Sequence, residues 1–374
     1  MLCQEGMCEE GMKKIGSDMG IAVIGGGNIG TQFACACAAR GYKVSVCSSR
    51  PECYDGILEM VDEKQHVTTG RVWNVTSSIP EAVEGCDIVF VTHPAFMLQE
   101  TADAMLPCIR EGMIICMLPG TGGAEFAFRE CIRAGAVLMG LQRVPSVARL
   151  EIYGKRVRCE GLRQKLHLAS IPREEAADFA DFMSDLWGIP CGVLPNYLSV
   201  TLTPGNPILH TTRLRTLFAD YEEGKVYPRN PLFYGEWSDA SSTLLMACDS
   251  ELQEMIRKMD RLDLSGVKSL RVHYESDTPE AMTRKLRSIR SLHNISSPMK
   301  QVEHGWIPDF SSRYFTADFP YGLAILEELA DVLGCEAPSI HSTMDWYRKM
   351  TGDMNRLDLT RYGIHSVEDL YALY

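Results

Sequence analysis

Three glycines near the beginning of the chain have the spacing of a phosphate-binding turn. They form the pattern Gly25-x-Gly27-x-x-Gly30, which follows an apolar run at 21–24 and precedes a run of small residues that ends at Gly41. Gly25 permits a tight turn, Gly27 lets the backbone approach a pyrophosphate, and Gly30 lets a helix pack close to the sheet. The N–H groups and the dipole at the start of that helix attract phosphates. A strand before the glycines and a helix after them favour a dinucleotide site over an ordinary glycine-rich turn.

The residues after the next predicted strand, at 43–47, indicate which dinucleotide is bound. NAD-binding folds place an Asp or Glu about 20 residues past the glycines, where it bonds the ribose 2′-hydroxyl. This chain has Ser48, Ser49 and Arg50 instead. Hydroxyl groups and a guanidinium suit a 2′-phosphate, which a carboxylate would repel. NADP is therefore the predicted cofactor. Glu52 close by leaves NAD open as the alternative, with Arg50 as a solvated loop residue.

Two segments in the second half of the chain carry residues suited to acid–base chemistry. Residues 203–210 read TPGNPILH, and residues 312–322 read SRYFTADFPYG. His210 can give and take a proton near neutral pH, and Asp318 beside it would fix the tautomer of the ring. The two residues are far apart in the chain, so their contact is an expectation about tertiary structure. The competing interpretation is a helix-surface histidine that a neighbour satisfies.

Arginines are the expected partners of substrate carboxylates because the guanidinium bonds both oxygens. Arg313 lies in the second of those segments, Arg149 follows the last predicted sheet strand, and Arg143 stands at the end of that strand. Asn206, four residues before His210, is a further candidate for substrate contact. Surface ion pairs are the competing interpretation for the arginines, and a helix cap for Asn206.

These residues must be positioned by elements that alternate through the first half of the chain. Strands are expected at 21–25, 43–47, 72–76, 87–92, 113–118 and 136–139, and helices at 28–40, 79–84, 95–110 and after Gly123. The alternation predicts an α/β fold with a Rossmann-type, doubly wound parallel sheet that binds ligands at the carboxyl ends of its strands. The predicted cofactor-binding residues are therefore Gly25, Gly27, Asn28, Ile29, Gly30, Ser48, Ser49, Arg50, His93, Pro94 and Gly120.

The pattern changes after the last of these strands. Short antiparallel strands are expected at 152–157 and 166–169, with a helix at 173–187, and the chain beyond Pro195 is mainly helical. Asn206 is expected to cap a helix that has Pro207 in its first turn, and further helices are expected at 321–333, at 338–350 and after Ser366. The predicted organisation is a flexible leader (1–18), a Rossmann NADP-binding domain (19–195) and a helical substrate domain (196–374).

Composition excludes several classes of protein. The 374 residues carry a formal net charge of -12, which argues against a general nucleic-acid binder. The 14 cysteines contain no C-x-x-C pair, so no metal site of that type is expected, and reduced thiols in the cytoplasm are predicted. The acidic beginning of the chain lacks the apolar centre of a secretory signal, and no apolar run is long enough to span a bilayer.

The glycine turn and the two segments with His210 and Asp318 together resemble the octopine/nopaline dehydrogenase family, or opine dehydrogenases, from about residue 20 to 370. The most specific matches are N-P-x-x-H at 206–210 and R-Y-x-x-x-D-x-P-Y-G at 313–322. Residues 118–123 and 147–149 are also similar. The resemblance implies a Rossmann domain followed by a helical domain like the carboxyl-terminal domain of 6-phosphogluconate dehydrogenase, with catalysis in the cleft between the two.

The resemblance also implies an activity. In this family the amine of an amino acid condenses with the carbonyl of an α-keto acid, and NAD(P)H reduces the imine reversibly. His210 matches the catalytic histidine, Asp318 its partner, and Arg313 a substrate-binding arginine. The residues that recognise the amino-acid side chain in octopine dehydrogenases have no counterpart here, so the identity of both substrates stays open. The implied partners are small molecules, not nucleic acid or membrane, and a homodimer is left open.

Two other functions compete with this one. Ketopantoate-reductase-like enzymes reduce 2-keto acids on a related two-domain frame and use a central lysine, but neither segment contains a lysine. An NADP-binding sensor that has lost catalysis is the second alternative, and the presence of both His210 and Asp318 counts against it.

Overall fold

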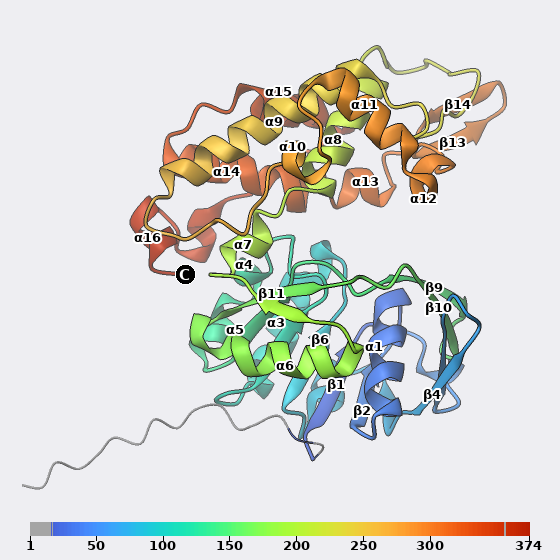
Figure 1. The fold of residues 1–374 in the computed structure, drawn as a ribbon, viewed down its shortest axis with the longest axis vertical. Coiled ribbons are helices and arrows are strands. Elements are labelled where there is room, and N and C mark those ends of the chain that lie inside the picture. Colours follow the sequence, from blue (N-terminus) through green and yellow to red (C-terminus); the bar gives the residue numbers. More distant parts are fainter. Residues whose placement is uncertain (1–15, 17, 355–356) are drawn as a thin grey trace, which may run out of the picture. The chain divides into compact units, whose positions relative to one another are not determined.

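Two compact units make up the part of the chain that this computed structural model describes, residues 16, 18–354 and 357–374 (Figure 1). The sheet unit comprises Met1–Thr92, Asp103–Pro119 and Glu130–Val193. The helical unit comprises His93–Ala102, Gly120–Arg129 and Leu194–Tyr374. Of the predicted leader at 1–18, residues 1–15 and 17 lie outside the described residues. None of the helices in the described part of the chain has both the length and the apolar character that a membrane span requires.

The sheet unit is organised around an eight-stranded sheet in the order β12-β11-β8-β7-β6-β1-β2-β5. All neighbours pair in parallel except β8 and β11, which are antiparallel. The chain moves outward from β1 in both directions, so the strand order reverses there, and ligands bind at such a switch point. The doubly wound sheet is thus confirmed. The strands are β1 (Gly20–Ile24), β2 (Lys43–Cys47), β5 (Asn74–Thr76), β6 (Ile88–Val91), β7 (Ile114–Met117), β8 (Val137–Leu141), β11 (Leu166–Ile171) and β12 (Cys191–Val193).

Helices pack on this sheet through large aromatic side chains. Phe33 of α1 (Asn28–Ala39) lies with its ring centroid 5.0 Å from Phe90 of β6 and 4.9 Å from Trp187 of α6 (Ala176–Trp187). The other helices here are α2 (Ile79–Val83) and α5 (Arg129–Arg133), and the division between the units falls within α3 (Leu98–Met105). The continuous helix predicted at 95–110 is wrong: short 3-10 turns flank α3. Pro107, in the second of these turns, cannot donate the hydrogen bond that a continuing helix needs.

A second sheet was not predicted. It has the order β4-β3-β10-β9, formed by β3 (Ile57–Val61), β4 (Val67–Arg71), β9 (Val147–Ile152) and β10 (Arg156–Glu160). The strand expected at 152–157 instead spans the turn between β9 and β10. Polar and charged residues interrupt these strands and weaken the apolar signal. The sheet lies against α1, where a Cβ on Gly70 would stand 2.6 Å from the Cys35 carbonyl oxygen.

The helical unit consists of helices and one hairpin. Glycines with positive φ, Gly334 at 59° and Gly352 at 70°, end α14 and α15, and the Ser366 side chain caps α16. The elements are α4 (Ala124–Ala127), α7 (Leu198–Thr201), α8 (Asn206–Leu217), α9 (Asp239–Lys258), α10 (Leu270–His273), α11 (Pro279–Ser288), α12 (Arg290–His293), β13 (Met299–Val302), β14 (Gly305–Pro308), α13 (Arg313–Thr316), a wide turn (Phe319–Leu323), α14 (Ala324–Leu333), α15 (Pro338–Thr351) and α16 (Val367–Tyr371).

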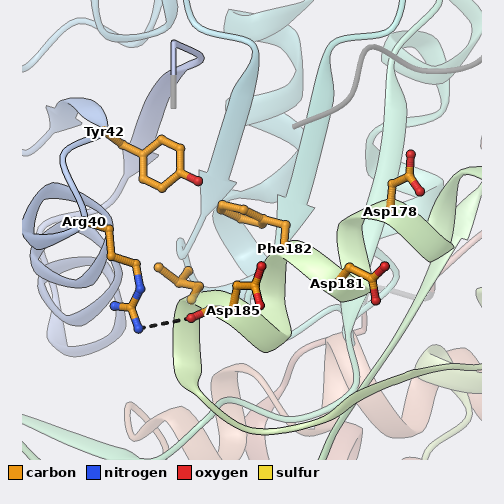
Figure 2. A pocket seen from close by; sticks show the side chains of 7 residues that line it. Arg40, Tyr42, Asp178, Asp181, Phe182 and Asp185 are labelled. Atoms are coloured by element: carbon orange, nitrogen blue, oxygen red, sulfur yellow. Dashed lines mark hydrogen bonds between the residues drawn. The ribbon is translucent and has the colours of Figure 1, made fainter. Parts of the chain in front are cut away.

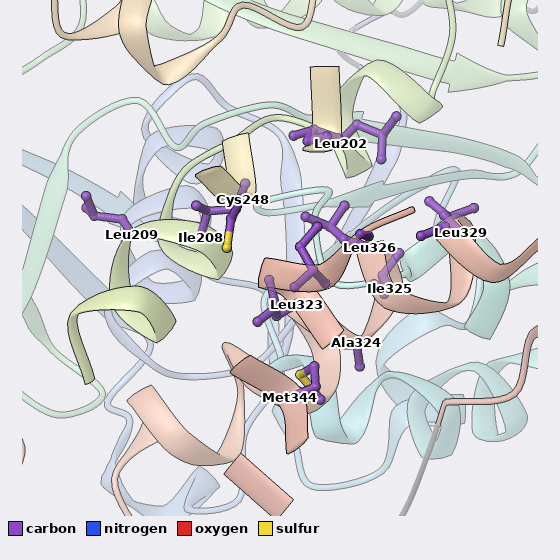
Figure 3. Close-up of a cluster of buried hydrophobic side chains, with 14 of the residues drawn as sticks. Leu202, Ile208, Leu209, Cys248, Leu323, Ala324, Ile325, Leu326, Leu329 and Met344 are labelled. Atoms are coloured by element: carbon purple, nitrogen blue, oxygen red, sulfur yellow. The ribbon is translucent and has the colours of Figure 1, made fainter. Parts of the chain in front are cut away.

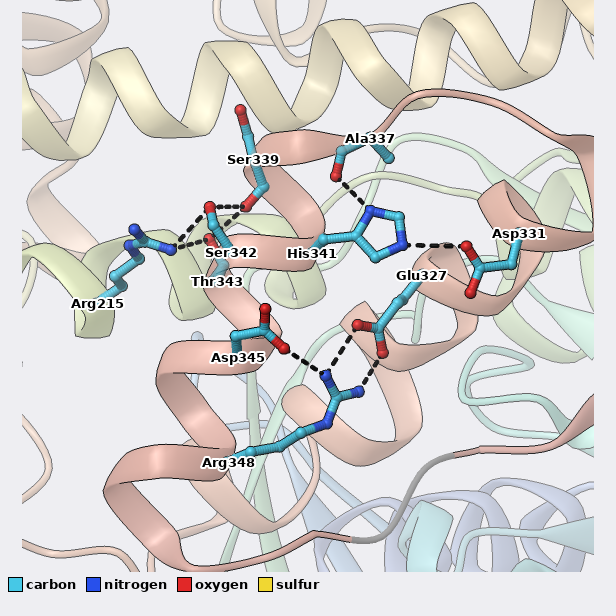
Figure 4. Close-up of polar contacts among 10 residues, drawn as sticks. All are labelled: Arg215, Glu327, Asp331, Ala337, Ser339, His341, Ser342, Thr343, Asp345 and Arg348. Carbon is cyan, nitrogen blue, oxygen red and sulfur yellow. Dashed lines mark hydrogen bonds and ion pairs between the residues drawn. The ribbon is translucent and has the colours of Figure 1, made fainter.

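The core of the helical unit is apolar, but a buried ion pair crosses it. Figure 3 shows side chains of α8, α9, α14 and α15 meeting in one cluster, with Ile208, Leu326 and Met344 among them. In Figure 4, the Arg348 guanidinium of α15 bonds both oxygens of Glu327 of α14, with 3.0 Å from Nη1 to Oε1. The exposed fraction is 5% for the Arg348 side chain and 2% for the Glu327 side chain. Since an unpaired buried charge is costly, this pair ties α15 to α14 at one register.

Candidate active site and cofactor site

The glycine turn of the sheet unit has the backbone geometry that a dinucleotide motif requires. Gly25 has φ of 113°, a conformation that only glycine adopts readily. A Cβ at Gly30 would stand 1.7 Å from the Gly25 carbonyl oxygen, so no larger residue fits there. A Cβ at Gly27 would meet nothing within 4 Å among the described residues. The turn is therefore tight on its inner side and open above Gly27, at the start of α1.

The first turn of α1 is open to an anion. No side chain of the described residues caps this helix, so its leading N–H groups are free to bind phosphate. Asn28 points elsewhere: its Oδ1 accepts the backbone N–H of Leu150 on β9, at 2.8 Å. Ile29 packs on the apolar cluster under the second sheet. Both side chains thus fasten the second sheet to α1, and only their backbones remain for a cofactor.

Three hydroxyl groups converge beside the turn. The Ser48 hydroxyl lies 2.8 Å from that of Tyr153 and accepts the backbone N–H of Arg50 at 3.2 Å. A Cβ on Gly26 would stand 2.4 Å from the Tyr54 hydroxyl, which has no hydrogen-bond partner in the described part of the chain. Burial raises the pKa of Tyr54. These neutral donors, with the exposed Ser49 beside them, fit the ribose and phosphate of a dinucleotide.

Arg50 is exposed and stacked on an aromatic ring. Its guanidinium carbon lies 3.6 Å from the centroid of the Tyr153 ring, a cation–π contact. Tyr153 comes from the turn between β9 and β10, about a hundred positions away in sequence, and was not predicted. Sequence offered no signal for Tyr153, which reaches this place through the second sheet, or for Tyr54, which follows the short 3-10 turn at Pro51–Cys53.

Three predicted cofactor residues belong to the helical unit. His93 has its Nδ1 2.8 Å from the buried Thr101 hydroxyl, and burial lowers the pKa of its ring. Pro94 begins the short turn that precedes α3. The carbonyl of Gly120 accepts the hydroxyl of the buried Tyr197 at 3.0 Å. Within the helical unit, the three are therefore tied to structural partners.

The contact expected between His210 and Asp318 is present in the helical unit. His210, on α8, has Nδ1 2.7 Å from Oδ2 of Asp318, which follows α13. Its Nε2 lies 2.8 Å from the hydroxyl of Tyr234, in the loop between α8 and α9. The exposed fractions of the side chains are 4% for His210 and 15% for Asp318. The ring is thus almost buried, with a partner on each nitrogen.

Aromatic rings surround this histidine, and Arg313 directly precedes one of them, Tyr314. The Tyr314 ring has its centroid 4.5 Å from that of His210, and Phe233 meets the ring edge-on at 5.5 Å. Burial, with neighbouring tyrosines and Asp318, raises the pKa of Tyr234, and the positive charge of Arg313 opposes the rise. Arg313 is exposed, and no carboxylate of the described residues pairs with it. The cluster combines a proton-transfer group with a cation available to an anionic substrate.

The remaining predicted substrate residues are divided between the units. Asn206 is exposed and lies four residues before His210, on the same face of α8. Its expected capping role is wrong: Gly205 occupies the N-cap, which puts Asn206 and Pro207 inside the first turn. Arg143 and Arg149 belong to the sheet unit. Arg149 is exposed on β9, and the charge of Arg143 adds to burial in lowering the pKa of Arg163.

A separate pocket lies at the other end of α1 from the glycine turn. Figure 2 shows Arg40 and Tyr42 facing a row of α6 aspartates, and Arg40 donates to the Asp185 carbonyl at 3.2 Å. Across the described residues, no group of three or more His, Cys, Asp or Glu side chains is arranged to hold a metal ion. This pocket therefore adds nothing to the chemistry of either candidate site.

Comparison with known proteins supports both halves of this description. Residues 193–351 match the model for the α-helical domain of NAD/NADP octopine/nopaline dehydrogenase, and residues 20–118 match a model for coenzyme F420-dependent NADP oxidoreductases. The chain is 26% identical to octopine dehydrogenase of Pecten maximus, over 80% of this chain and 79% of the relative. It is 25% identical to tauropine dehydrogenase of Arabella iricolor, over 74% of each.

Solved structures have the same fold. An octopine dehydrogenase solved with NADH and pyruvate superposes with a TM-score of 0.83 at 23% identity, over 94% of this chain and 98% of that one. The Rossmann sheet, the helical unit and these matches define the protein as an NAD(P)-dependent oxidoreductase that acts on C–N bonds. These similarities confirm the resemblance to the opine dehydrogenase family that the motifs of the chain indicate.

Proposed function

We propose that this enzyme condenses an amino acid with an α-keto acid and reduces the resulting imine with NADPH, in a reversible reaction. The observation that carries the proposal is the buried His210, held between Asp318 and Tyr234, with the exposed Arg313 directly before Tyr314, whose ring packs on that of His210. A proton-transfer group and an exposed cation in one segment of the fold suit a reaction between two carboxylate-bearing substrates. Relatives named as octopine, tauropine and opine dehydrogenases support the same reaction type.

In this proposal residues 19–195 hold the dinucleotide. The N–H groups of Gly27, Asn28 and Ile29 would bind the pyrophosphate, while Gly25 and Gly30 shape the turn. When bound, the nicotinamide supplies the hydride. The 2′-phosphate would meet Ser48, Ser49, Arg50 and the unpredicted Tyr153. NADP is therefore the proposed cofactor, and His93, Pro94 and Gly120 complete the proposed site.

Residues 196–374 would bind the substrates and move the proton. Asp318 orients the His210 ring and fixes its tautomer. Arg313 binds a substrate carboxylate, and Asn206, one helical turn before His210, contacts the substrate from the same face of α8. Arg143 and Arg149, on the sheet unit, are the proposed partners of a second carboxylate.

Steady-state oxidation of NADPH tests the reaction. Absorbance at 340 nm is followed with a keto acid, alone and with each member of an amino-acid panel. A rate that requires both partners supports the proposal. A rate with the keto acid alone would assign a 2-keto-acid reductase of the ketopantoate type, and no rate with any pair would leave an NADP-binding sensor. Parallel titrations with NADPH and NADH test the cofactor, and tighter binding of NADH would reverse that assignment.

Two further properties follow from the same proposal. The cytoplasm is the proposed location, because the cysteines among the described residues are all free thiols, as in a reducing compartment. Light scattering on the purified enzyme distinguishes a monomer from the homodimer that the sequence leaves open.

A further inference from the structure

Both ring nitrogens of His210 already have hydrogen-bond partners. Asp318 lies at Nδ1 and Tyr234 at Nε2, and only 4% of the His210 side chain is exposed. An ionised carboxylate can only accept hydrogen bonds, so Nδ1 of the neutral ring carries the proton and donates to Asp318. The lone pair of Nε2 then accepts the Tyr234 hydroxyl. The nitrogen that must exchange a proton is therefore covered by a phenol.

Tyr234 is fixed in this place by the helix that carries His210. Arg213, also on α8 and buried, donates to the carbonyls on either side of Tyr234: Nε to Phe233 at 3.1 Å and Nη2 to Glu236 at 2.8 Å. The Tyr234 ring also stacks on Trp237, with centroids 6.1 Å apart. A loop clamped at both sides does not let the phenol swing away to uncover Nε2.

The cation expected to bind substrate adjoins this cluster in sequence: Arg313 directly precedes Tyr314, whose ring centroid lies 4.5 Å from that of His210. The positive charge of Arg313 also opposes the rise in the pKa of Tyr234 that burial causes. A carboxylate held by Arg313 would therefore bring the reacting carbon and its substituents toward the phenol. A tyrosine hydroxyl donates one proton and accepts another, so it can pass a proton on without a net change of its own.

We propose that Tyr234 is a catalytic proton relay between His210 and the substrate. The inference rests on the proposed condensation. In the condensing direction, the phenol gives its proton to the hydroxyl of the carbinolamine and takes the Nε2 proton of the His210 imidazolium in the same event. The C–O bond breaks, water leaves and the iminium forms. One proton leaves the imidazolium, one reaches the substrate, and Tyr234 ends as it began. The reverse reaction uses the same path.

Two substitutions at Tyr234 separate a relay from a packing role. Tyr234→Phe keeps the ring and removes the hydroxyl, so a relay predicts a fall in kcat of about 10²-fold with unchanged NADPH affinity. Tyr234→Ser removes the ring but leaves space and a hydroxyl through which water can reach Nε2. A relay therefore predicts that Tyr234→Ser turns over faster than Tyr234→Phe. A packing role predicts the opposite order, since Phe has nearly the original shape.

Tyr347→Phe is the matched control. Tyr347 belongs to the same unit, is 4% exposed like Tyr234, and donates its hydroxyl to Asp353 at 3.2 Å. Its kcat should equal that of the unmodified enzyme. The relay is overturned when Tyr234→Phe is as fast as Tyr234→Ser or faster, or stays within threefold of the unmodified enzyme. An unmodified enzyme that does not need both substrates would instead refute the condensation itself, and this is measured first.

Discussion

The glycine turn of the sheet unit and the His210 site of the helical unit are built from different parts of their residues. At the turn the backbone matters: Gly25 supplies a φ of 113°, and Gly30 supplies the absence of a Cβ that would stand 1.7 Å from a carbonyl oxygen. These residues lie in one short stretch of the chain, 25–30. The His210 site depends on side chains from α8, from the loop after it and from the segment after α13.

The difference decides which changes each site tolerates. A backbone site is damaged by added atoms, because the turn has no room for them. A side-chain site is damaged when atoms are removed, because the hydrogen-bond partners of the lost group are left buried and unpaired. The following predictions test this contrast in order of decreasing effect.

His210→Ala should lower turnover by about 10²-fold or more, the usual contribution of general acid–base catalysis. NADPH affinity should change little. His341→Ala is the control, because that ring also has a partner on each nitrogen: the Ala337 carbonyl at 2.8 Å and Asp331 at 3.1 Å. Its side chain is 31% exposed, against 4% for His210. Steady-state kinetics should leave His341→Ala at full rate. If the two variants turned over at equal rates, the catalytic role of His210 would be refuted.

Glu125→Gln should remove part of the pH dependence of stability. The Glu125 carboxyl is fully buried, accepts hydroxyls from Thr201 and Tyr374, and has its pKa raised by burial to about 7. The unfolded chain ionises this group near its ordinary pKa of 4.5, so the folded state holds the proton more tightly between these two pKa values. The free energy of unfolding therefore falls as pH rises from 4.5 to 7, by roughly 3 kcal/mol in total at about 1.36 kcal/mol per pKa unit.

Urea unfolding at a series of pH values measures this term. Glu125→Gln is neutral at every pH, and its amide oxygen still accepts both hydroxyls, so the variant should match the unmodified protein near pH 4 and exceed it in stability near pH 8. Glu130→Gln is the control, since Glu130 is 64% exposed in a surface ion pair and should leave the pH dependence unchanged. If the free energy of unfolding of Glu125→Gln kept the original pH dependence, the Glu125 carboxyl would not be the source of that dependence.

Gly30→Ala and Gly27→Ala should separate folding from cofactor binding at the turn. The Gly30 substitution forces the backbone apart and should lower the free energy of unfolding by about 1–3 kcal/mol, along with NADPH affinity. Gly27 has ordinary φ of -82°, and its Cβ would meet nothing within 4 Å of the described residues. Gly27→Ala should therefore keep its stability and lose only NADPH affinity. Thermal unfolding and fluorescence titration measure the two effects, and unimpaired NADPH binding by Gly27→Ala would exclude a close approach there.

The same contrast explains what sequence could predict. Strands β1, β6 and β7 are continuous apolar runs, and the glycine turn is a local pattern, so both were found from neighbouring residues. The second sheet was missed because polar and charged residues interrupt its strands and weaken the apolar signal. Tyr153 and Tyr234 were missed because no local pattern marks a residue whose partner lies elsewhere in the chain. The pair of His210 and Asp318 was found only through the family motifs that contain it.

Arg50→Gln should have the smallest effect, because Arg50 is exposed and stands at the edge of the turn. The variant keeps a polar side chain of similar length but loses the charge that would face a 2′-phosphate. NADPH affinity should fall about tenfold, or about 1.4 kcal/mol, while NADH affinity stays unchanged.

Arg133→Gln is the control for that loss of charge. Arg133 is 57% exposed, in a surface pair with Glu130 on the same unit, and its substitution should alter neither affinity. Fluorescence titrations with both dinucleotides are compared for the three proteins. Because NADPH and NADH differ only in the 2′-phosphate, an equal loss of affinity for both would place Arg50 away from that group. A loss of affinity for NADPH alone would show that the glycine turn, which binds through its backbone, also depends on the side-chain charge of Arg50.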